Sequence, residues 1–120
     1  MEEDKTALSL SFAKSIESNL KIWIEEKRFL QSGVTIEDVS RQIATNKKYF
    51  SVYINKHINK TFRDWINDLR IEEAKRLTKE NPALTFLQIA ELTGYSTNSH
   101  FSAIFKKTTG KTLTEYRKEN

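Results

Sequence analysis

Residues 35–58 read TIEDVSRQIATNKKYFSVYINKHI, and residues 85–108 read TFLQIAELTGYSTNSHFSAIFKKT. The two stretches repeat one pattern of apolar, small and polar residues at a nearly constant separation. A shift of 50 positions aligns Thr35 with Thr85, Ile36 with Phe86, Val39 with Ile89, Ser40 with Ala90, and Ala44 with Gly94. Beyond the turn a shift of 51 aligns Phe50 with Phe101, Ile54 with Phe105, and Lys56 with Lys107. The chain therefore contains an internal repeat whose second copy has one extra turn residue.

Each copy has the pattern of a short helix, a tight turn and a second helix, which is the helix-turn-helix arrangement. Thr35 and Thr85 precede the first helices and are predicted to be their N-caps. Gly94 suits a turn residue with positive φ, whereas Ala44 at the equivalent position lacks that freedom. The first turn is therefore expected to be either slightly strained or built differently from the second.

The second helix of each copy is predicted to turn a small, polar or basic face away from the core. At the spacing i, i+3, i+4, i+7, the first face comprises Lys48, Ser51, Val52 and Asn55, and the second comprises Ser99, Ser102, Ala103 and Lys106. Such side chains let a helix enter the major groove of DNA and contact base edges. The helix starts at Asn46–Lys47 and Thr97–Asn98 are predicted to hold phosphates through free backbone N–H groups.

The rest of the chain is also predicted to be helical, because only three glycines and one proline interrupt it. Leu8, Phe12, Ile16, Leu20 and Ile24 recur at every fourth residue and predict a helix over residues 8–30, ended by Gln31–Gly33. Thr61 is expected to cap a connecting helix over 61–79, and Thr112 a last short helix. Seven helices and no strand predict an all-α fold.

These elements predict a domain over residues 16–120, preceded over 1–15 by a linker or the start of the first helix. The first helix-turn-helix spans 35–58, the connecting helix 61–79, and the second helix-turn-helix 85–108. The connecting helix would be roughly 27 Å long. Since recognition elements in successive major grooves lie roughly 34 Å apart, one chain is expected to read two adjacent grooves.

Side-chain periodicity also predicts which bulky residues are buried. Phe50, Phe101 and Phe105 fall on the core stripe of their helices and are expected inside, together with Trp23 and Trp65. Phe86, Leu87, Ile89 and Ala90 are expected to form the inner side of the helix that Thr85 caps. His57 is expected to be structural or solvated.

Charge is distributed unevenly along the chain, whose net charge is +4 and whose sequence pI is about 9.3. Residues 1–34 hold five Lys and Arg against six Asp and Glu, so their net charge is −1. The remainder holds 15 basic and 10 acidic residues, a net charge of +5. Because the repeat lies in this basic part, the distribution favours a polyanionic partner such as nucleic acid.

Other function classes find little support in the composition. There is no cysteine, so disulfides, thiolate zinc sites and a cysteine nucleophile are excluded. Two distant histidines predict no metal site, and the pairs Glu25–Glu26 and Glu72–Glu73 are expected on exposed helix faces rather than in acid–base catalysis. No apolar run approaches the roughly 20 residues of a membrane helix, and no signal-peptide pattern is present. An enzyme, a cofactor and membrane contact by this segment are therefore not expected. The cytoplasm is the predicted location, with a stand-alone protein and the cytosolic part of a larger or membrane-tethered one both left open.

A longer pattern comprises Ile89–Ala90, Gly94–Tyr95–Ser96, Phe101, Phe105–Lys106–Lys107, Gly110–Lys111–Thr112 and Tyr116–Arg117. This pattern resembles the DNA-binding domain of the AraC/XylS family of bacterial transcription regulators. The resemblance covers about residues 16–117. The family's connecting helix is resembled by Arg70–Ile71, Ala74 and Leu77. Two stretches resemble the corresponding stretches of large multidomain sensor regulators, Tyr53–Asn55 and Asn67–Ala74. Leu113 stands where the family usually has proline.

By position, the resemblance implies base contacts from Lys48, Ser51 and Val52 in the first copy, and from Asn98, Ser99, His100, Ser102 and Ala103 in the second. Phosphate contacts are predicted for Asn46, Lys47, Thr97, Lys106 and Lys107. Val52 and Ala103 stand where basic residues are common in the family. The implied partners are double-stranded promoter DNA and RNA polymerase, and a parent protein would supply any dimer contact.

A second class of function remains open at this point. A helical protein-interaction module with weak or no DNA specificity would share the same fold, and the absence of arginine from the two recognition faces motivates it. Exchanging Lys48 and Ser99 for glutamate separates the two hypotheses, because only a DNA-binding domain would lose DNA affinity.

Overall fold

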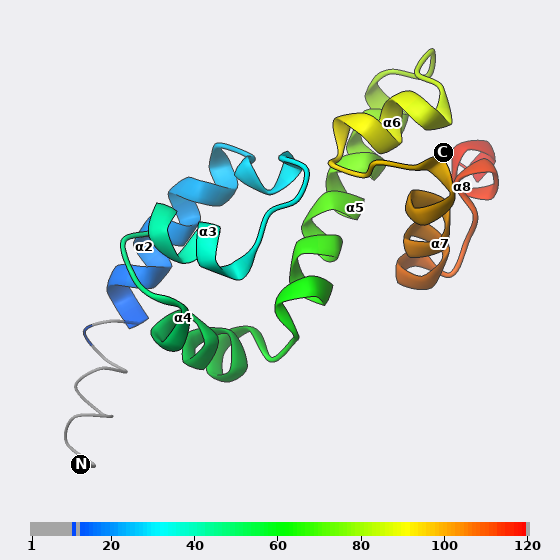
Figure 1. Cartoon of the computed structure of the whole chain (residues 1–120). Coiled ribbons are helices and arrows are strands. Elements are labelled where there is room, and N and C mark those ends of the chain that lie inside the picture. The colour runs from blue at the N-terminus through cyan, green and yellow to red at the C-terminus, as the bar shows by residue number, and fades with distance from the viewer. Residues whose placement is uncertain (1–10, 12, 120) are drawn as a thin grey trace. The chain divides into compact units, whose positions relative to one another are not determined.

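A computed structural model describes residue 11 and residues 13–119 (Figure 1). Within this part of the chain there are seven α-helices and no strand, which confirms the predicted all-α fold. The helices are α2 (Ala13–Glu25), α3 (Ile36–Gln42), α4 (Lys47–Tyr53), α5 (Phe62–Glu80), α6 (Phe86–Leu92), α7 (Asn98–Thr109) and α8 (Leu113–Glu119). Leu8 and Phe12 of the predicted first helix, and residues 1–10 of the predicted linker, lie outside the described residues.

The described residues form two compact units, and each contains one copy of the repeat. The first unit comprises the chain up to Arg28 and Val34–Trp65, and the second comprises Phe29–Gly33 and the chain from Ile66 onward. Helices α3 and α4 therefore belong to the first unit, and α6 and α7 to the second.

Aromatic side chains hold the core of the first unit. The rings of Trp23 and Trp65 stack with centroids 5.8 Å apart, and Phe50 meets Trp65 edge-on at 5.9 Å. All three are buried, as predicted. The Trp23 indole N–H donates to Gln42 Oε1 at 2.6 Å, so its one polar group is satisfied. The other buried apolar residues of this unit are Ile16, Leu20, Val39, Ile43 and Ile54.

The prediction of one helix over residues 8–30 is wrong at its C-terminal end. Helix α2 stops at Glu25, and Lys27 adopts a left-handed φ of 57°. A 3-10 turn, η2 (Arg28–Leu30), follows and buries Phe29. A regular helix cannot continue through a left-handed residue, and neither glycine nor asparagine marks this position in the sequence.

The first helix-turn-helix begins and ends with side-chain and backbone caps. The Thr35 hydroxyl accepts from Asp38 N at 3.1 Å while Asp38 Oδ2 accepts from Thr35 N at 3.2 Å, which completes a capping box. The helix predicted to reach Ile58 is regular only as far as Tyr53, because a π-helical turn, η3 (Ile54–Ile58), replaces its end. Asn59, with φ 58°, closes this turn by donating to Ile54 O at 2.7 Å.

Ala44 adopts a left-handed φ of 61°, so of the two alternatives left open for the first turn, strain is the one observed. We expect Ala44→Gly to raise the free energy of unfolding by up to about 1 kcal/mol. Relief of the roughly 1–2 kcal/mol cost of a left-handed Cβ exceeds the added freedom of the unfolded chain, about 0.4–1 kcal/mol. Urea denaturation measures the change.

The matched control is Ala103→Gly, at an exposed position within α7. There the same substitution should lower the free energy of unfolding by about 1 kcal/mol, the ordinary helix-propensity cost of glycine. Equal destabilisation at Ala44 and Ala103 would show that the left-handed residue stores no strain.

The second unit packs α6, α7, α8 and most of α5 around a continuous apolar core. Its buried members are Ile71, Ala74, Ile89, Ala90, Tyr95, Phe101, Phe105 and Leu113. The predicted burial of Phe101 and Phe105 is confirmed, but Leu87 is 50% exposed, so its predicted inward position is wrong. Since α6 has only seven residues, its inner side is filled by Ile89 and Ala90 with Phe86 at the edge.

The exposed face predicted for Glu72 and Glu73 is correct only for Glu72. Glu73 is buried, and Arg76 binds its two carboxylate oxygens at 2.9 and 2.6 Å. Adjacent helical residues point about 100° apart, so one glutamate of the pair can face inward while the other faces solvent. The bidentate arginine pair compensates the buried carboxylate.

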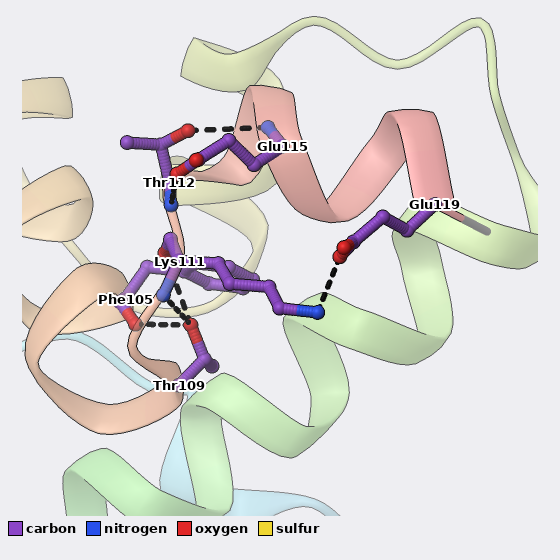
Figure 2. A network of polar contacts seen from close by, with 6 residues as sticks. All are labelled: Phe105, Thr109, Lys111, Thr112, Glu115 and Glu119. Atoms are coloured by element: carbon purple, nitrogen blue, oxygen red, sulfur yellow. Dashed lines mark hydrogen bonds and ion pairs between the residues drawn. The ribbon is translucent and has the colours of Figure 1, made fainter.

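Figure 2 shows how the chain passes from α7 into α8. Gly110 adopts φ 81° and closes α7 by donating to Lys106 O at 2.8 Å. The Thr109 hydroxyl donates to Phe105 O at 2.8 Å and accepts from Lys111 N at 3.1 Å. Thr112 and Glu115 form a capping box at the start of α8. This closure fixes the C-terminal end of the second helix of the repeat.

Candidate nucleic-acid interface

The two copies of the repeat share their local backbone geometry, each within its own unit. The N–H of Thr45 donates to Ser40 O at 2.8 Å, and the N–H of the equivalent Tyr95 donates to Ala90 O at 2.9 Å. Ser40 and Ala90 are both fully buried. A small side chain at this position lets the second helix of each copy pack closely against the first. The repeat predicted from the sequence is therefore present in the fold.

The second turn is stabilised by a buried polar cluster formed by Asn67, Arg70 and Tyr95. The Tyr95 hydroxyl donates to Asn67 Oδ1 at 2.8 Å, and the Arg70 guanidinium lies 5.3 Å from the centre of the Tyr95 ring. Arg70 also donates to Phe29 O at 2.8 Å and to Gln31 O at 2.9 Å. Burial raises the pKa of Tyr95 to about 12 and lowers that of Arg70. The cluster ties the turn before α7 to α5.

The first turn has a different environment. Thr45 stands at the position of Tyr95, and its buried hydroxyl has no hydrogen-bond partner among the described residues. The preceding residue is Ala44, whose backbone is strained by its left-handed φ. The second copy has Gly94, with φ 92°, at the equivalent position. An unsatisfied buried hydroxyl and a left-handed alanine both lower local stability. The turn before α4 is therefore held less firmly than the turn before α7.

Helix α4 exposes most of its predicted recognition face. Lys48 and Val52 are exposed and Ser51 is half-buried. Asn55 is exposed too, but it lies in the π-helical turn beyond the end of α4, so it does not continue the regular helical spacing of the other three. His57 is exposed, and its ring centre lies 4.7 Å from that of Tyr53.

Helix α7 exposes its whole predicted face. The exposed residues are Asn98, Ser99, His100, Ser102, Ala103 and Lys106. The Ser102 hydroxyl donates to Asn98 Oδ1 at 3.4 Å, one turn apart on the same side of the helix. The rings of His100 and Tyr95 meet edge to face with centroids 5.4 Å apart, which places His100 beside the buried polar cluster.

The predicted phosphate contacts differ in how free their side chains are. The side-chain oxygens of Asn46 and Thr97 already accept from Tyr49 N and His100 N, at 2.9 and 3.1 Å, as helix N-caps. Lys47 lies in an exposed ion pair, its Nζ 3.1 Å from Glu37 Oε2. A backbone hydrogen bond at Glu37, followed by the Lys47 contact, lowers the pKa of the Glu37 carboxyl.

Beside α7 there is a hollow of about 600 Å³. Phe86, Ala103 and Leu113 contribute apolar lining, and Lys106 and Lys107 contribute positive charge. Both lysines are exposed. The two lysines give the edge of this hollow a positive charge, which favours an anionic partner.

The buried cluster of Asn67, Arg70 and Tyr95 was not predicted from the sequence. Asn67 and Arg70 are three residues apart on α5, a helical spacing that indicates one face, but no local signal links them to residues 28 to 41 positions away. Within the described residues there is no group of three or more His, Asp or Glu side chains placed to hold a metal ion. Nor is any described helix long and apolar enough to cross a membrane.

Comparison with known proteins identifies a matching family model and related regulatory proteins. A family model described as a helix-turn-helix domain matches residues 39–119. The Msm operon regulatory protein of Streptococcus mutans is 25% identical over 115 residues, which cover 92% of this chain and 41% of that protein. The chain thus spans less than half of that relative.

Two solved structures at 28% identity have the same fold. The C-terminal domain of AraT, a response regulator from Geobacillus stearothermophilus, has a TM-score of 0.77, covering 88% of this chain and 85% of that one. The C-terminal domain of the two-component response regulator yesN from Fusobacterium nucleatum has a TM-score of 0.69, covering 82% and 98%.

Proposed function

The chain belongs to the AraC-type helix-turn-helix family of DNA-binding transcription regulators, and we propose that it recognises specific duplex sites by placing α4 and α7 in two adjacent major grooves. The observation that carries the proposal is the repeat itself. Each unit offers a second helix with one side packed on aromatic core residues and the other exposed, small and polar or basic. A helix in the major groove needs this division.

In this proposal base edges and phosphates are contacted by different residues. Lys48, Ser51 and Val52 of α4, and Asn98, Ser99, His100, Ser102 and Ala103 of α7, contact bases, with Asn55 at the border of the first site. Lys106 and Lys107 contact phosphates beside α7, and Lys47 does so beside α4 once it leaves Glu37. Asn46 and Thr97 contribute by fixing the helix starts, where backbone N–H groups face the DNA.

The whole protein to which this domain contributes is proposed to be a bacterial promoter regulator acting in the cytoplasm. The match to C-terminal domains of response regulators favours an output domain of a larger sensor protein. In that setting RNA polymerase is the further partner, and dimerisation would come from the parent protein.

The salt dependence of binding tests the proposal directly. Fluorescence anisotropy with a labelled duplex should give an affinity that falls with salt. The log–log slope should be about −2 to −3, because Lys106 and Lys107 neutralise phosphates and Lys47 does so only where it leaves Glu37. The absence of salt-dependent binding to any duplex would contradict the proposal and favour the protein-interaction alternative.

Glu37 limits the contribution of Lys47, which gives a second prediction. We expect Glu37→Gln to tighten DNA binding and to steepen the salt slope by about 0.9, because Lys47 is released to neutralise one more phosphate. The control is Glu72→Gln, which removes the same charge from an exposed ion pair with Lys75 on α5. Equal effects of the two variants would show that only net charge matters.

A further inference from the structure

Val52 is the largest exposed apolar side chain on the outward face of α4. It is 45% exposed, with Lys48 one helical turn before it. Covering an apolar group that is otherwise exposed to water lowers the free energy of the complex. Ala103, also exposed, occupies the equivalent position of α7 at the repeat shift of 51. Both recognition faces therefore carry an apolar group at the same register.

The major groove offers one apolar group among the base edges, the C5-methyl of thymine. Arginine, the usual partner of guanine, is absent from the exposed faces of both α4 and α7. Serine hydroxyls serve any base, so they do not shift the preference. Lys48 and Lys106 retain the capacity to bind guanine or phosphate, and neither competes with an apolar contact at Val52.

We propose that Val52 selects an A·T pair by covering the methyl group of its thymine, which the shorter side chain of an alanine would not reach. The proposal rests on the placement of α4 and α7 in major grooves. It assigns to the operator an A·T pair at the position that Val52 covers in the α4 block.

Replacing thymine by uracil removes only the methyl group and tests this assignment. Starting from a duplex recovered from a random pool, each thymine of the bound blocks is exchanged in turn and the affinity measured. In the α4 block one exchange should weaken binding about fourfold, the transfer free energy of one apolar carbon. Val52→Ala should abolish the sensitivity at that position, and 5-methylcytosine placed there should bind more tightly than cytosine.

Ile22→Ala is the matched control, because Ile22 is 53% exposed on α2 and outside both recognition faces. It should leave the uracil sensitivity unchanged. In a second variant, Val52→Arg should shift the preference at the same position toward G·C. Circular dichroism checks that each variant is folded.

The possible failures are distinguishable. A random pool that yields no enriched site would overturn the placement in major grooves and this inference with it. An enriched site whose binding is indifferent to uracil at every thymine would overturn the inference alone. Unchanged sensitivity in the Val52→Ala variant would assign the methyl contact to another residue and would also overturn it.

Discussion

Gly94→Ala is expected to lower the free energy of unfolding of the second unit by about 2–5 kcal/mol. A Cβ there would lie 2.7 Å from the backbone carbonyl oxygen of Leu30 and 3.0 Å from the guanidinium of Arg70. Arg70 cannot withdraw without losing its bonds to Phe29 O and Gln31 O. Overpacking of roughly 1–3 kcal/mol adds to the roughly 1–2 kcal/mol cost of a left-handed side chain.

Gly110 provides the control for this prediction. Its φ is 81°, close to that of Gly94, but a Cβ there would meet nothing within 4 Å. Gly110→Ala should therefore cost only the left-handed term, about 1–2 kcal/mol. Thermal and urea unfolding of both variants measure the difference. Equal losses would mean that close packing at the second turn contributes nothing.

The double variant Lys48→Glu with Ser99→Glu is expected to lose about 100-fold or more in affinity for its specific site. Each substitution places a carboxylate on a face proposed to meet base edges, where one contact is worth about 1–3 kcal/mol. Both residues are exposed in the first turn of their helices, where an acidic side chain stabilises the helix. The fold should therefore survive, and circular dichroism verifies it.

Ser18→Glu with Lys21→Glu is the matched control for the charge reversal. It makes the same change of charge at two exposed positions of α2, outside the recognition faces. Anisotropy titrations at one salt concentration should show a much smaller loss for this pair. A comparable loss would attribute the effect to net charge, and unchanged affinity in the Lys48 and Ser99 variant would contradict the assigned faces.

The periodic features of the fold could be predicted from the sequence. N-cap residues such as Thr35 and Thr85 bind backbone groups within four residues, so the helix starts can be predicted from the local sequence. Phe50 and Ile54 lie four residues apart, as do Phe101 and Phe105, so each pair falls on one face of its helix. The shift of 51 aligns the two pairs. These features depend on short-range geometry, and the repeat supports them because the same pattern occurs in both copies.

Features set by tertiary contacts could not be predicted. Lys27 and Ala44 adopt left-handed backbone although neither residue type favours it, so surrounding packing must impose it. Arg70 reads locally as one more exposed helical arginine, and only the fold brings the carbonyls of Phe29 and Gln31 to it. The outward position of Leu87 is likewise a consequence of packing, because Ile89 and Ala90 occupy the core side of α6.

The recognition faces fall between these cases. The exposure of Lys48, Val52 and Ser99 follows from the helical spacing of the core residues beside them. The position of Asn55 does not, because the π-helical turn at Ile54–Ile58 has no signal in the sequence. The role of each exposed residue on DNA remains a prediction.

Selection from a pool of random duplex DNA at about physiological salt, followed by sequencing, tests the central proposal most directly. Two short conserved blocks whose centres lie about one helical turn apart are the predicted result, because α4 and α7 would each read one major groove. A single block would contradict reading by both copies of the repeat. No enrichment, with only weak salt-sensitive binding, would contradict sequence-specific recognition by this domain.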